Sequence, residues 1–262
     1  MTSNIHPMKY ALYAITAFFA FTATGPAFTT PALADPLEIS ASQELIWDQN
    51  KGIYKAIGDA SATRGPQAIM ADKLTAFYDS TGDDQEIQRI LAENAVRFSD
   101  TDLSGKGAKL NYDIRTEFYE LFGPDAEIIS KDGTANATNK LSYDRKNGLL
   151  IAEKQGRIAL ADGRILEGDL LEITLDEAEE IQTIIATGDV YVRQSNGRQA
   201  RGQEGTYDAA TGKAILTGDV SIRDGDSVLN GQKAEIDFNK GISRLLAGDD
   251  KQRVSGILTE SK

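Results

Sequence analysis

A short motif recurs about every 30 residues along this chain, and it limits the possible folds more than any other feature. Each copy has a small or polar residue, then Asp or Asn, then Ala or Val; the copies centred at 155 and 249 are degenerate. The central positions are 59, 94, 125, 155, 189, 219 and 249, separated by 35, 31, 30, 34, 30 and 30 residues. Such a period predicts one supersecondary unit stacked repeatedly, with each copy burying its apolar face against its neighbours.

The residues around each motif alternate with the period of a β-strand. One copy places Ile184, Ala186, Gly188, Val190 and Val192 on a single face, and the next copy repeats the pattern from Ala214 to Ile222. A Gly inside a strand usually marks a bend, a bulge or a close backbone approach. Because the Gly recurs in three copies, at 58, 188 and 218, we expect stacked strands that all bend at the same level.

Tight turns separate the expected strands. Segments such as 141–144 (LSYD) precede turn-like residues at 145–148, 209–212 and 239–241. A parallel β-helix, a sandwich and a β-jellyroll all fit stacked strands of this length. Strands paired through tight turns favour an all-β fold, namely an elongated, open antiparallel β-jellyroll of ~30-residue repeats with little helix. The acidic stretches 83–92 and 176–185 are interpreted as loops that run into strands.

The first 34 residues have the order of a secretory signal. They contain no Asp or Glu, Lys9 precedes an apolar run from Tyr10 to about Ala23, and the segment ends in Ala32-Leu33-Ala34. We therefore expect cleavage after Ala34 and a periplasmic mature chain of residues 35–262. An uncleaved N-terminal anchor is the alternative.

Removing the signal also removes His6, the only His, and the chain has no Cys. The mature chain therefore cannot use Ser–His, Cys–His or His–metal chemistry. The formal net charge of −12 also argues against a nucleic-acid partner, because phosphate contacts need clustered Lys and Arg. One recurrent Asp per repeat does not supply the six to eight oxygen ligands of Ca²⁺. We expect no metal and no cofactor.

Several segments resemble the LptA/OstA family of periplasmic lipopolysaccharide-transport proteins. They are residues 39–48 (ISASQELIWD), 56–60 (AIGDA), 69–74 (IMADKL), 108–112 (AKLNY), 121–126 (LFGPDA) and 141–143 (LSY), with the signature repeated at 201–208 (RGQEGTYD) and 216–220 (LTGDV). The resemblance covers nearly the whole mature chain. It implies a transport protein rather than an enzyme, with a β-jellyroll that shields acyl chains and bridges the inner and outer membranes. The chain has more repeats than a minimal member needs, so we expect two OstA-like units, 35–150 and 151–262.

The implied binding site is a lining of apolar side chains. The candidate lining residues are Ile39, Ile69, Ala71, Leu110, Tyr112, Ile128, Leu141, Tyr143, Ile173, Val190, Val192, Tyr207, Val220, Ile222, Ile236 and Phe238. The alternative is that these residues form a sealed core and never touch lipid, because an apolar stripe is more often core.

The resemblance also implies partners. These are lipopolysaccharide, through its lipid A acyl chains, and the inner-membrane and outer-membrane components of the transport bridge. Head-to-tail self-association is a further expectation. Unpaired strand edges invite added strands, and the candidates are the strands near 37–45 and 253–258.

Two other functions stay open. A carbohydrate-active enzyme on a β-solenoid would use paired carboxylates, and a buried carboxyl pair with a raised pKa facing a groove would favour it. The membrane-anchored partner of the same transport system would share the fold but keep its N-terminus.

Overall fold

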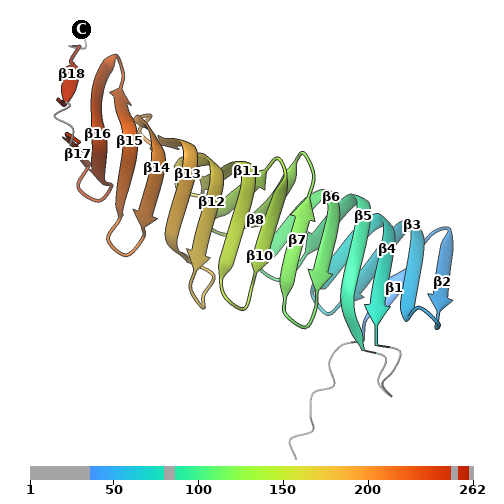
Figure 1. The fold of residues 1–262 in the computed structure, drawn as a ribbon. Helices are drawn as coiled ribbons and strands as arrows, with labels where there is room; N and C mark the ends of the chain where they lie inside the picture. Colours follow the sequence, from blue (N-terminus) through green and yellow to red (C-terminus); the bar gives the residue numbers. More distant parts are fainter. Residues whose placement is uncertain (1–35, 80–85, 249–252, 260–262) are drawn as a thin grey trace, which may run out of the picture. The chain divides into compact units, whose positions relative to one another are not determined.

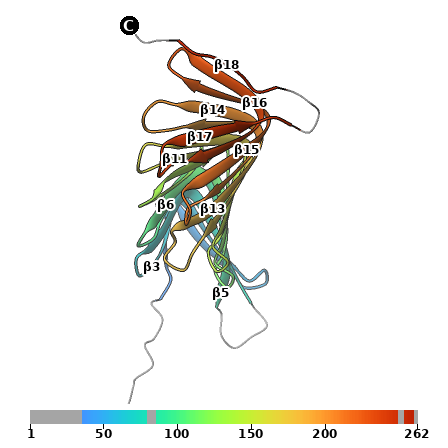
Figure 2. The same cartoon turned by 90° about the vertical axis from the view of Figure 1, so that its left-hand side faces the viewer.

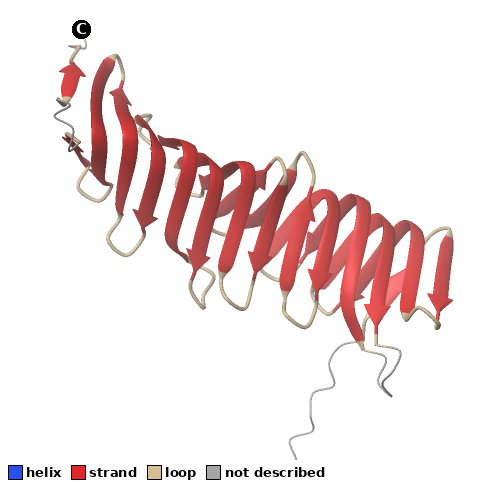
Figure 3. Ribbon diagram, viewed as in Figure 1, coloured by secondary structure: helices blue, strands red, loops and turns tan. Residues whose placement is uncertain are grey.

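The computed structural model describes residues 36–79, 86–248 and 253–259, which form a single antiparallel sheet of 18 strands (Figure 1). No helix occurs in these ranges (Figure 3), so none of them contains a helix that could cross a membrane. Residue contacts divide the chain into Met1–Ala34 and Asp35–Lys262, and every strand belongs to the second unit. The expected signal segment, its cleavage site and the motif copy at 249 lie outside the described residues.

The strands follow one another with short connections. They are β1 (Glu38–Ser40), β2 (Glu44–Asp48), β3 (Ile53–Arg64), β4 (Gln67–Tyr78), β5 (Ile87–Ser99), β6 (Leu103–Asp113), β7 (Phe118–Phe122), β8 (Ala126–Ser130), β9 (Gly133–Ala137), β10 (Lys140–Asp144), β11 (Leu149–Leu160), β12 (Ile165–Leu175), β13 (Ile181–Arg193), β14 (Gln199–Asp208), β15 (Lys213–Asp224), β16 (Ser227–Asp237), β17 (Ile242–Leu246) and β18 (Ser255–Ile257). The expected all-β, antiparallel jellyroll with tight turns is confirmed.

The long strands bend in the middle, so the sheet has two walls. Pairing between neighbours changes register at the bend, as between Ile57 and Ala60 in β3 and between Thr217 and Val220 in β15. We call the halves paired alongside β2, β7, β10 and β17 the first wall. The halves alongside β1, β8, β9 and β18 form the second wall, and the line of bends between them is the spine. Figure 2 shows the two layers diverging.

The recurring motif produces these bends. Gly58 and Asp59 have φ values of 82° and 40°, and the pair at 188 and 189 has 75° and 44°. Gly adopts this left-handed region at no steric cost, and Asp and Asn tolerate it better than most residues. Successive residues at positive φ also occur at Asn94–Ala95 and at Lys154–Gln155. The expectation of stacked bends at one level is therefore confirmed for these copies.

The copy centred on Asp125 forms a different structure. It lies in a connection between β7 and β8, and the positive φ there belongs to Gly123, at 132°. The position of Gly58 or Gly188 in the motif is occupied here by Pro124. Proline cannot reach positive φ because its ring fixes φ near −65°. The strand consequently breaks at this copy.

A pair of glycines tests what the bend requires. Gly218 has φ 79°, and a Cβ built there would lie 2.7 Å from Gln203 Cβ, whereas Gly225 has φ 59° with nothing within 4 Å. Left-handed backbone costs an Ala roughly 1–2 kcal/mol. We expect Gly225→Ala to lower the free energy of unfolding by only that amount. Gly218→Ala should lower it by at least ~1 kcal/mol more, because the added Cβ would overlap Gln203. Urea midpoints of the two variants measure the difference; equal losses would show that contact at the bend is unimportant.

Leucines on the first wall fill the space next to the spine. Six of them are almost completely buried: Leu74, Leu110, Leu121, Leu141, Leu171 and Leu216. The second wall opposes several of them with glycines. A Cβ on Gly107 would lie 2.8 Å from Leu121 Cδ1, and one on Gly156 would lie 2.9 Å from Leu171 Cγ. The walls therefore approach so closely at the spine that leucine meets bare backbone.

Candidate binding groove

Away from the spine, a second row of side chains faces the space between the walls, which we call the groove. On the first wall, Tyr112, Tyr119, Tyr143, Leu150 and Ile173 are partners in successive strand pairs. On the second wall, Phe98, Gly105, Ile128, Ala135 and Ile158 form the corresponding row. Because strand side chains alternate in direction, both rows point into the same space. The groove is therefore lined by aromatic and aliphatic groups.

The structure divides the sequence-predicted lining residues into two groups. Five lie at the spine, where the interior is closed: Ala71, Leu110, Leu141, Val190 and Val220. Eleven lie farther from the spine, facing the groove: Ile39, Ile69, Tyr112, Ile128, Tyr143, Ile173, Val192, Tyr207, Ile222, Ile236 and Phe238. Ile39, Tyr207 and Phe238 are partly buried, and the others are buried. Contact with lipid remains a prediction for both groups.

Three small apolar cavities follow one another in the groove. The central cavity, of about 60 Å³, is lined by residues that include Ile128, Ala135, Tyr143, Leu150 and Ile173. The C-terminal cavity, of about 40 Å³, is lined by residues that include Ile184, Val192, Tyr207, Leu216 and Phe238. The N-terminal cavity, of about 20 Å³, is lined by residues that include Leu37, Ile69, Phe98, Tyr112 and Tyr119. The groove is thus largely filled by its own side chains.

Polar contacts cross the open side of the groove, which we call the mouth. Arg145, in the turn after β10, lies on the first wall, and Asp100, in the turn after β5, lies on the second. Arg145 Nη1 is 2.7 Å from Asp100 Oδ2, and its Nε donates to Glu179 Oε1 at 2.8 Å. Burial acts to raise the pKa of Asp100, but hydrogen bonds from Gln67 and Thr101 and the charge of Arg145 outweigh it and lower the pKa. Asp100 is therefore held as a carboxylate.

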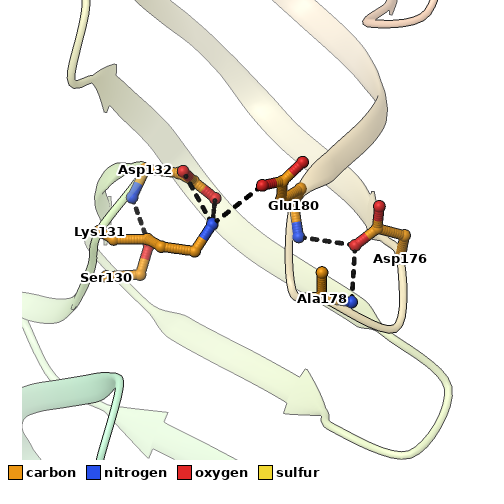
Figure 4. Close-up of polar contacts among 6 residues, drawn as sticks. All are labelled: Ser130, Lys131, Asp132, Asp176, Ala178 and Glu180. Atoms are coloured by element: carbon orange, nitrogen blue, oxygen red, sulfur yellow. Dashed lines mark hydrogen bonds and ion pairs between the residues drawn. The ribbon is translucent and has the colours of Figure 1, made fainter.

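A second contact crosses the mouth beside the central cavity (Figure 4). Lys131, in the turn between β8 and β9, is 3.4 Å from Glu180 in the loop between β12 and β13. That loop is shaped by Asp176, whose Oδ1 accepts the backbone N–H groups of Ala178 and Glu180, each at 2.9 Å. The turn at 130–133 and the loop at 176–180 thus meet over the groove.

A third contact closes the C-terminal cavity. The Arg164 guanidinium lies 5.1 Å from the ring centre of Tyr207 and 5.2 Å from that of Phe238. These distances are within the range of cation–π attraction. Asp100, Lys131, Arg145 and Arg164 were not among the site residues predicted from the sequence. The predicted turns could have indicated these residues, because the turns between strands lie at the outer edges of the two walls.

Among the described carboxyls, those with a shifted pKa, namely Asp48, Glu93, Asp100, Asp113 and Glu127, all have it lowered, chiefly through hydrogen bonds to the charged form. A general acid of a glycosidase needs a raised pKa instead. Across the ranges that the structure describes, no group of three or more His, Cys, Asp or Glu residues could hold a metal ion.

Comparison with known proteins gives two findings. The sequence model of the family described as LptA/(LptD N-terminal domain) LPS transport protein matches residues 38–149 and 154–242. Among solved structures, this chain is similar to LptH, described as the LptA homologous periplasmic component of the conserved lipopolysaccharide transport device from Pseudomonas aeruginosa. The identity is 11%, the match covers 86% of this chain and 96% of that chain, and the TM-score is 0.22. The search of curated proteins gave no match.

The two stretches matched by the family model together cover well over half of the chain, and they include most of the strands that build the two walls. The resemblance read from the sequence motifs is confirmed. The chain belongs to the LptA/(LptD N-terminal domain) family of lipopolysaccharide transport proteins.

Proposed function

We propose that this protein carries lipopolysaccharide by holding its acyl chains between the two walls, with the sugars left outside the mouth. The observation that carries the proposal is the groove itself, a line of apolar cavities between two rows of inward side chains. Each CH₂ removed from water contributes ~0.8 kcal/mol, so exposing a chain of about a dozen carbons costs on the order of 10 kcal/mol. A protein that moves such a lipid through water must cover its chains.

The proposal includes a place in a chain of proteins between the two membranes. The support is at the ends of the sheet, where β1 and β2 pair with β3, and β17 and β18 pair with β16. Leu45 and Trp47 on β2 are 56% and 49% exposed, and Ile257 on β18 is 70% exposed. Edges with exposed apolar residues favour strand addition by a partner or by a second copy.

Two further elements belong to the same proposal. The mature chain acts in the periplasm after cleavage behind Ala34, which intact-mass measurement of the periplasmic protein would test; a retained N-terminus would favour the membrane-anchored partner. The groove comprises two OstA-like units, 35–150 and 151–262. The family match, divided between residues 38–149 and 154–242, is compatible with that division.

Photo-cross-linking in cells tests the groove. We expect a benzophenone side chain at Tyr143 or Ile173 to capture lipopolysaccharide, because both positions line the central cavity. Glu172 is the control, since it follows the same strand but points to the outer face. Ser142 is a poorer control because it is buried despite its outward direction. Equal capture at Ile173 and Glu172, or none at Tyr143 and Ile173, would contradict the proposal.

A further inference from the structure

An aromatic layer separates the N-terminal cavity from the central cavity. The two cavities share no lining residue. Between them, Phe98 of the second wall stacks on Tyr119 of the first wall, with ring centres 5.6 Å apart. Tyr119 stacks in turn on Tyr112 and Tyr143, at 4.2 Å and 6.2 Å. The rings therefore span the groove from one wall to the other.

The local sequence makes room for this layer. Gly105 is the strand partner of Phe98, and a side chain at Gly105 would overlap the Phe98 ring. Phe98 can therefore lie across its neighbouring strand toward Tyr119. Burial raises the pKa of Tyr119, and a hydrogen bond with Tyr112 adds to the effect, so its hydroxyl stays neutral.

The polar contacts of Arg145 lie over the same part of the groove. Asp100 lines the N-terminal cavity and Glu179 lines the central cavity, and Arg145 binds both. Gln67 Nε2 also donates to Asp100 Oδ2, at 3.0 Å. The Asp100 side chain is only 7% exposed and that of Arg145 24%, so the pair is largely shielded from water. Such a pair is costly to separate because each charge then loses its partner in a partly dry site.

The spine is interrupted at this point. Continuous bent strands join the walls along most of the described sheet, but β7 and β8 are separated at 123–125, and β9 and β10 at 138–139. These two interruptions lie on the spine side of the row that contains Tyr119 and Tyr143. The walls are therefore linked by connections rather than strands where the aromatic layer and Arg145 close the groove.

We propose that Arg145 and the Phe98–Tyr119 layer divide the groove into two separate acyl-chain sites, and that a chain passes between them only when Arg145 releases Asp100. This inference rests on the proposed lipid-carrying function. It adds that the groove is not a continuous channel at rest. Acyl chains are held in successive compartments, and the Arg145–Asp100 ion pair controls passage between the first two.

The time course of lipid capture at two positions tests the division. Benzophenone is placed at Ile69, in the N-terminal cavity, or at Ile173, in the central cavity, of the full mature chain. Purified lipid A is added, and samples are irradiated at increasing times. In the otherwise unchanged protein we expect capture at one position to lag behind the other. Arg145→Met should shorten the lag about tenfold, the change that corresponds to ~1.4 kcal/mol of barrier.

Arg157→Met is the matched control, because Arg157 makes a single ion pair with Glu167, at 3.2 Å, away from the groove lining. It should leave the lag unchanged. Asp100→Asn removes one charge while keeping the shape, and it should shorten the lag less than Arg145→Met. If Arg145→Met does not fold, as judged by circular dichroism, the lag measured in Asp100→Asn decides whether the ion pair controls passage.

The outcomes separate this inference from the proposed function. Simultaneous capture at Ile69 and Ile173 in the unchanged protein would overturn the division but support lipid carriage. An unchanged lag in Arg145→Met and Asp100→Asn would show that Arg145 does not control passage. No capture at either position would instead contradict the proposed function. A lag that shortens in both groove variants and not in Arg157→Met supports the division.

Discussion

Replacement of Leu171 by Ala is expected to destabilise the fold by about 2–5 kcal/mol, the range for buried Leu→Ala changes. Leu171 is 0% exposed. Its side chain lies against two glycines of the second wall, since a Cβ on Gly156 or Gly168 would lie 2.9 Å or 3.2 Å from Leu171 atoms. Bare backbone on both strands cannot move in to fill the space. A drop in the urea midpoint measures the loss.

Leu170→Ala provides the matched control for this variant. Leu170 is the same residue type, one position earlier in β12, and points to the outer face, where it is only partly buried. We expect it to cost less than ~1 kcal/mol, because its Ala variant leaves no enclosed cavity. Similar losses for Leu170→Ala and Leu171→Ala would mean that the spine is not the tightly packed part of the molecule.

Ala135→Leu is expected to affect stability and lipid binding differently. Ala135 lines the central cavity and is buried between Ile128 and Ile158. A leucine there would fill apolar space without adding charge, so the urea midpoint should stay the same or rise. The added carbons would displace about three methylenes of a bound chain, which at ~0.8 kcal/mol each weakens binding by roughly 50-fold. Titration of the purified protein with labelled lipid A measures the affinity.

The control for Ala135→Leu is Ala108→Leu, which adds the same volume at the exposed bend of β6, outside the lining of the central cavity. It should leave lipid A affinity unchanged. An unchanged affinity in Ala135→Leu, with the fold intact, would show that acyl chains do not enter the central cavity. A loss in both variants would point to a general effect of added apolar surface on the assay.

Much of this architecture follows from local rules that one sequence can express. The strand period placed Ile173 and Val192 on inward faces, and the Gly188–Asp189 pair predicted a bend, because few residues adopt positive φ. The copy at Asp125 was counted as an intact motif, and the structure shows instead a break between β7 and β8 where Pro124 replaces the Gly. The local rules did not distinguish Leu110, at the spine, from Tyr112, two residues farther into the groove, since both share one face.

The contacts across the mouth could not be predicted in this way. Asp100 and Arg145 are 45 residues apart, and each lies in a turn whose composition is ordinary. The contact between Asp100 and Arg145 depends on how far the walls diverge and on which turns face each other. Local backbone preferences determine neither of these. Phe98 depends likewise on Gly105 being its partner, which is a matter of register between strands.

The repeated bend has a consequence for how a protein with this fold changes in length. Because successive strands bend at one level, an added hairpin extends the molecule without altering its cross-section. Strands are spaced about 4.8 Å apart, so each hairpin would add roughly 10 Å. The length of such a sheet can therefore increase by duplication of a short gene segment, because each added copy continues the same interior.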